Sequence, residues 1–466
     1  MPRIWRRPRA PRRPMAAVAV AVVCAMSFIL GTAIPKGNAQ ETTTSGQTTT
    51  SRATTTTAPT QAARQPTVKP QVTTKTTTRL FGNNPFEVAV AVTQHIWPAV
   101  LPPAAQSVPD RPRGLTLLVP DDPLTAITAT PLVHFPDDAP ILWVTNSGIP
   151  EVTRNEIKRL GPVGIARFNN VQAFLVGAAA NPAVKRQLTA MGIKWFAVTA
   201  PNIPELANRV DELYGRIANP DTGVVDMGGA EANNGAQDVV IGSIDGKDYQ
   251  FLLPATHWVT HMPTGLLWVT KNSVPQGTIE ALRRRNVNAA RIYVFGGPDQ
   301  ISASVIQTLT RFGTVMRVTN DDEVAFNAPP TNTPVDTAIV FNKMWDSTGL
   351  MGWKITGPGH GFTLVRLDDW QGAVASSPLS HLGFHAPLLF TTSPTQLPAI
   401  VDAYYKAVAP TFLTSPADGP YNMTYVIGSF DHITWGLQAH VDNISEMANR
   451  RNWAQNTGGR YSDSQP

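Results

Sequence analysis

The chain has 466 residues, of which 42% are hydrophobic and only 15% charged, so it is long enough to form several packed cores. Residues 1–78 contain 11 of the 38 basic residues and one of the 33 acidic residues, which leaves residues 79–466 with a net charge of −5. That balance argues against a nucleic-acid-binding body, which would need a basic face. The single cysteine, Cys24, excludes an internal disulfide and a cysteine-based metal site.

Residues 1–39 have the pattern of an export segment. Six arginines precede an apolar run, Met15–Ile34, that is long enough to cross a bilayer. Two interpretations are open. A signal peptide would be cut after Ala39, where Gly37 and Ala39 satisfy the small-residue rule, whereas a signal anchor would stay in the membrane. The length of the apolar run favours the anchor, and in both cases the arginines stay inside while the remainder is exported.

Residues 40–78 form a linker in this interpretation. Their composition is dominated by Thr, Ala, Gln and Pro, and nothing in it can bury a core. The segment is therefore predicted to be disordered and partly extended.

A first α/β unit is predicted over residues 79–198. It opens with a helix over Glu87–Ile96 after an Asn/Pro turn, followed by the strand LTLLVP and a small-residue helix in DDPLTAITATPLVHF. The strand Ile141–Thr145 comes next. Two further helix–strand pairs end the unit at Val198.

A second unit is predicted over residues 199–319. Its opening helix lies in APNIPELANRVDELYGRI, and a Gly/Asn-rich loop leads to the strand DVVIGS. The stretch from Gly265 to Thr319 then reads as strand, helix, strand, helix and strand. The short, fully apolar run LLWVT is typical of a strand covered on both faces.

A third unit is predicted over residues 320–450. We expect its first strand in DTAIVFNKMW and its small-residue helix in LDDWQGAVASSPLSHLGFH, with GPGHGF between them as an exposed loop. PLLF and TYVIG are further strands, and residues 451–466 form a polar tail that we expect to be frayed.

The same order of elements thus occurs three times. One set of equivalent positions holds Trp143, Trp268 and Phe390, and another holds the glycines Gly177, Gly296 and Gly428. A period of roughly 120 residues is too long for a solenoid repeat and indicates three copies of a small α/β domain.

These motifs resemble the cell wall-binding repeat 2 (CWB2) family over nearly all of residues 79–450. RLFGNNPFEVAVA, from Arg79, is similar to the family's opening R-x-x-G-x-x-R-Y-E-T-A-V-A. DDWQGAVASSPLSH resembles its D-A-L-A-A-G-P-L-A segment, with Gly372 where the family has Asp. PILWV, GLLWV and PLLF resemble its P-I-L-L-V strand, and IYVFGGPDQIS and TYVIGSFDHIT resemble its V-Y-I-V-G-G-x-x-A-I-S.

The resemblance implies a fold and a function. The fold is Rossmann-like α/β, with three tandem repeats packed around a pseudo-threefold axis. The function is non-catalytic attachment of exported proteins to secondary wall polymers of Gram-positive bacteria.

Cofactor and metal sites are not predicted. The pair Gly296–Gly297 follows a strand but lacks the third glycine of a dinucleotide fingerprint. His257 and His261 are four residues apart, but no Glu lies between them and prolines at 254 and 263 argue against a long helix. No motif of a catalytic serine accompanies these histidines.

The candidate polymer-binding residues are basic side chains at equivalent helix ends: Arg283, Arg284, Arg285, Arg291, Lys158 and Arg159. One interpretation is a solvated helix end that suits the helix dipole. The other is a local contact, because guanidinium groups bind phosphate or carboxylate bidentately. In the second case, replacing Arg283, Arg284 and Arg285 by Ala should abolish wall binding with little change in the melting temperature.

The sequence therefore predicts a non-enzymatic, exported protein at the cell wall or on the outer face of the membrane. Its partner would be an anionic wall polysaccharide, with the membrane as a second partner if the N-terminal segment is uncleaved and no role for nucleic acid. One alternative is an exported α/β enzyme acting on envelope glycan. Its candidate catalytic carboxylates would be Asp121 with Asp122 or Asp368 with Asp369. The other is a surface scaffold that binds protein.

Overall fold

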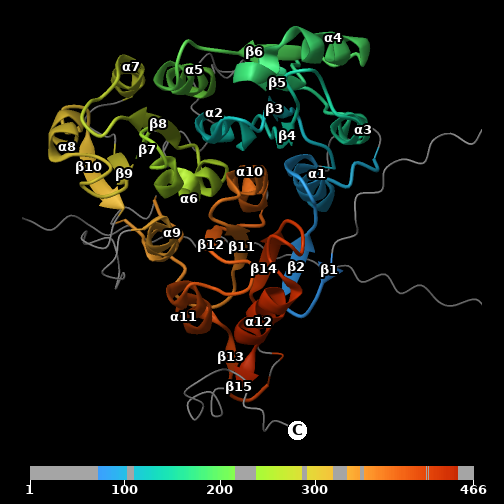
Figure 1. Cartoon of the computed structure of the whole chain (residues 1–466), viewed down its shortest axis with the longest axis vertical. Helices are drawn as coiled ribbons and strands as arrows, with labels where there is room; N and C mark the ends of the chain where they lie inside the picture. Colours follow the sequence, from blue (N-terminus) through green and yellow to red (C-terminus); the bar gives the residue numbers. More distant parts are fainter. Residues whose placement is uncertain are drawn as a thin grey trace, which may run out of the picture. The chain divides into compact units, whose positions relative to one another are not determined.

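The structure is a computed structural model that describes residues 72–101, 110–215, 238–285, 291–318, 333–346, 351–381, 383–415, 417 and 419–449. It has parallel β-sheets flanked by helices, so the predicted α/β fold class is confirmed (Figure 1). The expected export segment, the first part of the linker and the polar tail lie outside the described residues. Within the described residues, no helix is long and apolar enough to span a membrane.

The first two sheets each contain four parallel strands. In both, the strands lie side by side in the order second, first, third and fourth along the chain. The first sheet, ordered β4-β3-β5-β6, consists of β3 (Thr116–Leu118), β4 (Ile141–Trp143), β5 (Ala173–Val176) and β6 (Trp195–Val198). The second, ordered β8-β7-β9-β10, consists of β7 (Val239–Ser243), β8 (Gly265–Val269), β9 (Arg291–Phe295) and β10 (Thr314–Val318). Their central strands are buried apolar runs, as the sequence pattern predicted.

The third sheet is completed by a strand from the beginning of the folded chain. Its own strands are β11 (Gly361–Arg366), β12 (Leu388–Thr391) and β14 (Met423–Ile427), and β2 (Thr77–Leu80) pairs in parallel with β14. Figure 1 shows β2, in blue, beside β14, in red. The short strand β1 (Val72–Thr73) pairs antiparallel with β2. The linker that was expected to extend to residue 78 therefore ends before residue 72.

The helices lie between successive strands. Those around the first sheet are α1 (Pro85–Ile96), α2 (Pro123–Thr128), α3 (Glu151–Leu160) and α4 (Pro182–Ala190). Those around the second are α5 (Ile203–Gly215), α6 (Tyr249–Val259), α7 (Gln276–Arg284) and α8 (Ala303–Leu309). Those around the third are α9 (Pro334–Lys343), α10 (Trp370–Ala375), α11 (Ala399–Val408) and α12 (Trp435–Ser445). Two short strands, β13 (Thr411–Phe412) and β15 (Ala448–Asn449), pair with each other.

One predicted strand is a helix. DTAIVFNKMW was expected to be the first strand of the third unit, but residues 334–343 form α9. Thr333 and Asp336 form a capping box at its start, and Pro334 occupies the first turn, where it needs no hydrogen-bond donor. The helix is apolar on most sides because it packs against both α6 and β12. A short apolar run of this kind fits a buried helix as well as a strand.

The three sheets are joined through short inner helices. The inner helices α2, α6 and α10 contact one another, and each comes from a different sheet. Small residues such as Ala126, Ala255 and Ala373 are fully buried there, because close approach of helices leaves no room for larger side chains. The opening helix α5 packs on both α2 and β8, and α1 in the same way packs on both α10 and β4. The core is therefore shared between the sheets.

Candidate functional site

The predicted basic residues at the end of α7 are mostly engaged inside the molecule. Arg285 is buried and forms an ion pair with Asp211. Arg284 Nη2 lies 2.9 Å from the other oxygen of Asp211. Arg291, at the start of β9, lies 2.9 Å from Asp238 through Nε and 3.0 Å from Asp346 through Nη1. These arginines neutralise buried carboxylates, which would otherwise be costly to desolvate.

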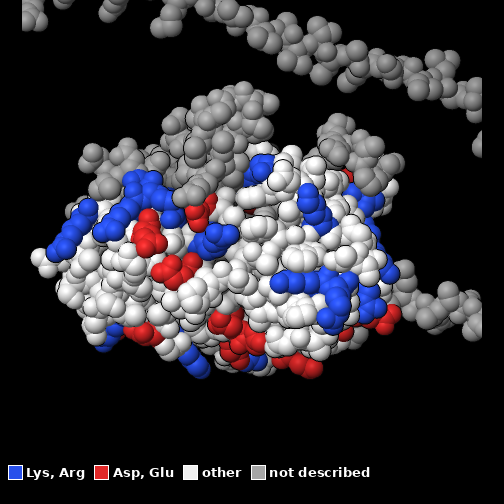
Figure 2. Space-filling model, turned by 90° about the horizontal axis from the view of Figure 1, so that it is seen from above, with Lys and Arg blue, Asp and Glu red and all other residues white. Residues whose placement is uncertain are grey.

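Of the equivalent basic residues near the first sheet, Arg159 is likewise hydrogen-bonded within the molecule, whereas Lys158 is exposed. Arg159 donates from Nε to Glu156 Oε2 at 2.8 Å and from Nη1 to the carbonyl oxygen of Trp97 at 2.8 Å. Lys158 and Arg283 are exposed. On the face shown in Figure 2, Lys and Arg side chains are interrupted by Asp and Glu instead of forming one continuous basic surface. The six residues therefore do not come together as one site, and polymer binding at Arg283 and Lys158 remains a prediction.

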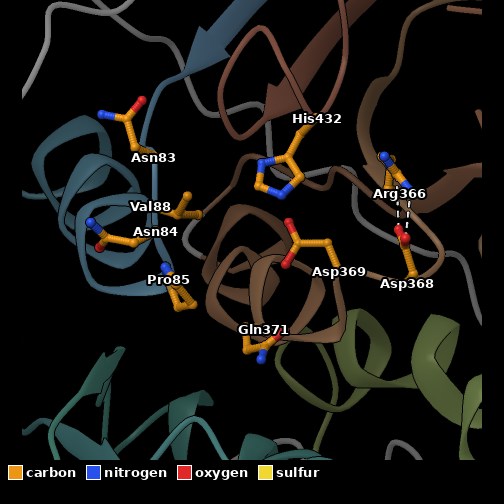
Figure 3. Close-up of a pocket in the computed structure, with 9 residues that line it drawn as sticks. All are labelled: Asn83, Asn84, Pro85, Val88, Arg366, Asp368, Asp369, Gln371 and His432. Carbon is orange, nitrogen blue, oxygen red and sulfur yellow. Dashed lines mark hydrogen bonds and ion pairs between the residues drawn. The ribbon is translucent and has the colours of Figure 1, made fainter. Parts of the chain in front are cut away.

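A cavity of about 350 Å³ lies at the carboxyl ends of the strands of the third sheet. Arg366 ends β11, Asp368 and Asp369 follow it, Gln371 lies in α10, and His432 follows β14. Asn83 and Asn84 follow β2, and Val88 of α1 closes the apolar side (Figure 3). β11 and β14 are neighbouring parallel strands. Parallel α/β sheets commonly bind ligands in the crevice outside the carboxyl ends of their strands.

Asp369 is the N-cap of α10, and among the residues that the structure describes only one of its two oxygens accepts a hydrogen bond. Oδ1 accepts a hydrogen bond of 2.8 Å from the backbone N–H of Gly372. The corresponding cap of α2, Asp122, uses both oxygens: Oδ1 accepts from the backbone N–H of Leu124, and Oδ2 accepts from the backbone N–H and the hydroxyl of Thr125. Gly372 stands where α2 has Thr125, so no hydroxyl occupies Oδ2 of Asp369. A Cβ on residue 372 would lie 2.3 Å from that oxygen, which is closer than atoms tolerate.

His432 faces Asp369 across the cavity (Figure 3). It stands four residues after Gly428, a glycine with a φ of 97°. Four residues after the corresponding glycines are Asn181, which caps α4, and Gln300, which accepts a bond of 3.1 Å from the N–H of Gly297. Both of these side chains are therefore used within their own loops. His432 instead makes one long contact, 3.5 Å, to the Ser429 hydroxyl and presents its ring to the cavity.

The loop that carries His432 is held by Arg79 of β2. Arg79 is fully buried and donates 3.0 Å hydrogen bonds from Nη1 to the carbonyl oxygens of Gly428 and Ser429, and one of 2.7 Å from Nη2 to that of Ile433. Its guanidinium also lies 4.4 Å from the ring centre of Phe430. Burial lowers the pKa of Arg79 to about 10, so it remains charged at neutral pH.

In the second sheet, an arginine holds the corresponding loop through the same kind of hydrogen bonds to carbonyl oxygens. Arg317 of β10 donates to the carbonyl oxygens of Gly296 at 2.7 Å and Ile301 at 2.6 Å. Sequence reasoning used Arg79 only as the opening of the first unit and missed Arg317. The spacing between each arginine and its loop is different, because Arg79 lies at the opposite end of the chain from its loop.

The charges around the cavity nearly cancel. Arg366 Nε lies 2.9 Å from Asp368 Oδ1, and this pair is partly exposed. Asp369 is less accessible, and burial raises its pKa, with His432 acting in the opposite direction. The cavity therefore offers hydrogen-bonding groups without an excess of positive charge.

The other residues weighed in the sequence have structural positions. Asp121 accepts a hydrogen bond of 3.2 Å from Asn146, and its neighbour Asp122 is the saturated cap already described. His257 is buried in α6 and contacts the Ser380 hydroxyl at 2.8 Å, whereas His261 lies beyond the end of that helix. In the described part of the chain, no group of His, Cys, Asp and Glu side chains is arranged to hold a metal ion.

The fold and cavity define an α/β protein with parallel sheets and a ligand-sized cavity at the strand ends of the third. No protein-family model matches the chain, and no curated protein matches its sequence.

Among solved structures, it is similar to Cwp6 from Clostridium difficile, with a TM-score of 0.57 and 18% identity over 80% of this chain and 47% of that chain. It is also similar to Cwp8 from the same organism, with a TM-score of 0.55 and 13% identity over 79% of this chain and 51% of that chain. The likeness thus spans about half of each of these proteins, and at these identities it shows the fold alone.

Proposed function

We propose that this chain is a non-enzymatic, exported protein that binds a polymer of the bacterial cell wall. The observation that carries the proposal is the likeness in fold, over four fifths of the chain, to two cell wall proteins. The partner is a secondary wall polysaccharide of a Gram-positive envelope. The N-terminal segment supplies membrane attachment if it is not cleaved.

Three tandem Rossmann-like repeats with pseudo-threefold packing are part of the same proposal. The common strand order of the sheets supports it, as do the glycines with positive φ at 177, 296 and 428. Arg79 and Arg317 make the same pair of carbonyl contacts in two of the sheets. The mutual contacts of α2, α6 and α10, one inner helix from each sheet, also support this packing.

Binding without catalysis fits the cavity better than hydrolysis of a glycan. Glycoside hydrolysis ordinarily needs two carboxyl groups flanking the bond that breaks. Asp368 is paired with Arg366 and more exposed, which leaves Asp369 as the carboxyl group that faces His432. Of the two carboxyl groups among the described residues that line the cavity, one is therefore engaged in an ion pair, whereas this chemistry needs both.

The proposal predicts selective cosedimentation with cell walls. The purified full-length chain should sediment with intact Gram-positive walls and stay in solution when the secondary polymers have been stripped from them. Because residues 79–466 carry a net charge of −5, raising the salt concentration should not abolish binding, as it would for long-range attraction to an anionic polymer.

Two results would contradict the proposal. One is sedimentation with neither preparation, and the other is equal sedimentation with both. Release of reducing sugar from the walls during incubation would instead support the enzyme alternative.

A further inference from the structure

The cavity beside the third sheet carries hydrogen-bonding groups suited to hydroxyls. Oδ2 of Asp369 is open on the cavity side, and the His432 ring faces it (Figure 3). Asn83 and Gln371 also line the cavity, and their side-chain nitrogens donate to Glu87 Oε2 at 3.2 Å and to the carbonyl oxygen of Pro120 at 3.4 Å, which leaves their amide oxygens for a ligand. Carboxylate, imidazole and amide groups together accept from and donate to vicinal hydroxyls, which both donate and accept. A carboxylate that accepts from a hydroxyl forms one of the stronger hydrogen bonds.

Two exposed aromatic rings lie close to His432 in the sequence. Phe430 and Trp435 lie two residues before and three residues after His432, and their side chains are 39% and 46% exposed. Their ring centres are 6.1 Å apart, and Phe81 lies 5.7 Å from Phe430 on the other side. Large aromatic residues are normally buried, so neighbouring exposed rings indicate a binding surface. The flat C–H face of a sugar ring is apolar and can stack on such a ring.

The charge of the cavity selects against anions. The Arg366 guanidinium is already paired with Asp368, and Asp369 adds a further negative charge whenever it is ionised. A phosphate or carboxylate placed beside Asp369 would be repelled, since like charges in a partly dehydrated site interact strongly. A neutral ligand pays no such cost.

The cavity chemistry is specific to the third sheet. Thr125 saturates the equivalent carboxylate beside the first sheet, and Gln300 folds onto its own loop beside the second. In the third, Gly372 and His432 replace these groups and leave the two side chains facing each other. The open site therefore follows from two residue choices at equivalent positions.

We propose that the cavity formed by Asp369, His432, Asn83 and Gln371 binds one neutral sugar residue of a cell-wall glycan, with Phe430 and Trp435 as the stacking surface. The inference deepens the proposed wall binding and rests on it. It assigns recognition to the neutral sugar ring, and it gives the predicted Arg283 contact no part in that recognition.

The test is a titration of the purified full-length chain. Glucose, galactose, mannose and N-acetylglucosamine serve as neutral probes, and glucose 6-phosphate and glucuronic acid as anionic ones. Tryptophan fluorescence follows binding, and Trp435→Phe tests whether the response depends on that ring. Asp369→Asn is compared with Asp122→Asn, because both variants remove the carboxylate of a helix N-cap and only the first faces the cavity.

We expect at least one neutral sugar to give a saturable change and to bind more tightly than either anionic probe. Asp369→Asn should weaken its affinity about tenfold or more, as expected for loss of a charged hydrogen-bond partner. Asp122→Asn should bind as the unaltered chain does. Equal weakening in both variants would reduce Asp369 to a helix cap and overturn the site, as would tighter binding of the anionic sugars.

A sugar can bind without changing tryptophan fluorescence, so the same sugars are also tested by isothermal titration calorimetry. The absence of both heat and a fluorescence change in the unaltered chain also overturns the site. Wall cosedimentation separates this inference from the proposed function. A chain that sediments with intact walls but binds no neutral sugar contradicts the cavity assignment alone. A chain that does not sediment contradicts the proposed function, whatever the titration gives.

Discussion

Arg79 is a buried cation whose recorded hydrogen-bond acceptors are all neutral. Three backbone carbonyl oxygens and the Gln438 side-chain oxygen, at 2.8 Å from Nε, accept its hydrogen bonds. The carbonyls belong to the two ends of the loop that carries Phe430 and His432. One side chain from the first folded strand therefore fixes the backbone of the proposed sugar site.

Arg79→Met should release that loop. The substitution keeps much of the apolar stem but leaves buried carbonyl oxygens without donors, which should reduce the free energy of unfolding by at least about 3 kcal/mol. Hydrogen exchange should show faster exchange of the amides of residues 428–433. Arg317→Met is the matched control, and it should accelerate exchange at residues 296–301 instead. Unchanged exchange of residues 428–433 in Arg79→Met would show that the loop does not depend on this contact.

At the scale of an element, the end of α7 shows how a basic run divides between surface and interior. Arg283 is exposed, whereas Arg285 reaches into the molecule and pairs with Asp211 of α5, which is itself buried. α5 and α7 are neighbours that both pack near β8. The basic run Arg283–Arg285 therefore lies at the end of α7 and also links α7 to α5 through Asp211.

Arg285→Ala should destabilise the protein, and Arg283→Ala should not. Removing Arg285 leaves the buried Asp211 with Arg284 as its remaining recorded ion-pair partner, for which we expect a loss of about 3 kcal/mol. An exposed arginine should change stability by no more than about 0.5 kcal/mol. Denaturant unfolding of the two variants measures the difference. Equal stabilities would contradict the assigned role of Arg285.

The variant in which Arg283, Arg284 and Arg285 are all replaced by Ala is therefore a poor test of polymer binding, since its melting temperature should fall.

At the scale of the whole molecule, histidines from all three sheets meet near the inner helices. His134 Nε2 lies 3.1 Å from the carbonyl oxygen of His261, and the His134 ring centre lies 5.7 Å from that of His381. His385 packs against His261 at 4.5 Å. Asp138 faces this cluster, with one oxygen 2.8 Å from His381 and the other 2.9 Å from Arg113.

The cluster predicts loss of stability in acid. Burial lowers the pKa of His134 and of His257 to about 4 and that of His261 to about 3. The unfolded chain therefore binds these protons first as the pH falls below about 6.5, so unfolding becomes easier between there and about pH 4. Asp137 acts in the opposite sense, because burial raises its pKa to about 7 and the folded form takes up that proton first.

Three histidines outweigh one carboxyl group, so the free energy of unfolding should fall by several kcal/mol between pH 7 and pH 4. Denaturant unfolding across this range measures the slope. His261→Phe should make it shallower by removing one of the titrating groups. A flat profile, or the same slope in His261→Phe, would show that the buried histidines do not control acid stability.

The sequence by itself determined most of the elements and the α/β class. Short apolar runs such as those of β8 and β9 indicate buried strands, because this signal depends on residues close in the chain. The same local signals could not separate α9 from a strand, since a helix buried on most sides has no polar face to reveal its period.

Only the tertiary structure decided which distant groups meet. β2 pairs with a strand more than three hundred residues away, and Arg285 finds its carboxylate 74 residues earlier in the chain. Strand pairing and charge neutralisation are satisfied by whichever partner packing brings near, and no local pattern names that partner. The sequence offered Asp369 only as one of an acidic pair with Asp368, and it did not single out His432. Their opposition across a cavity depends on how β11 and β14 lie side by side, and on which neighbouring groups leave their polar atoms open.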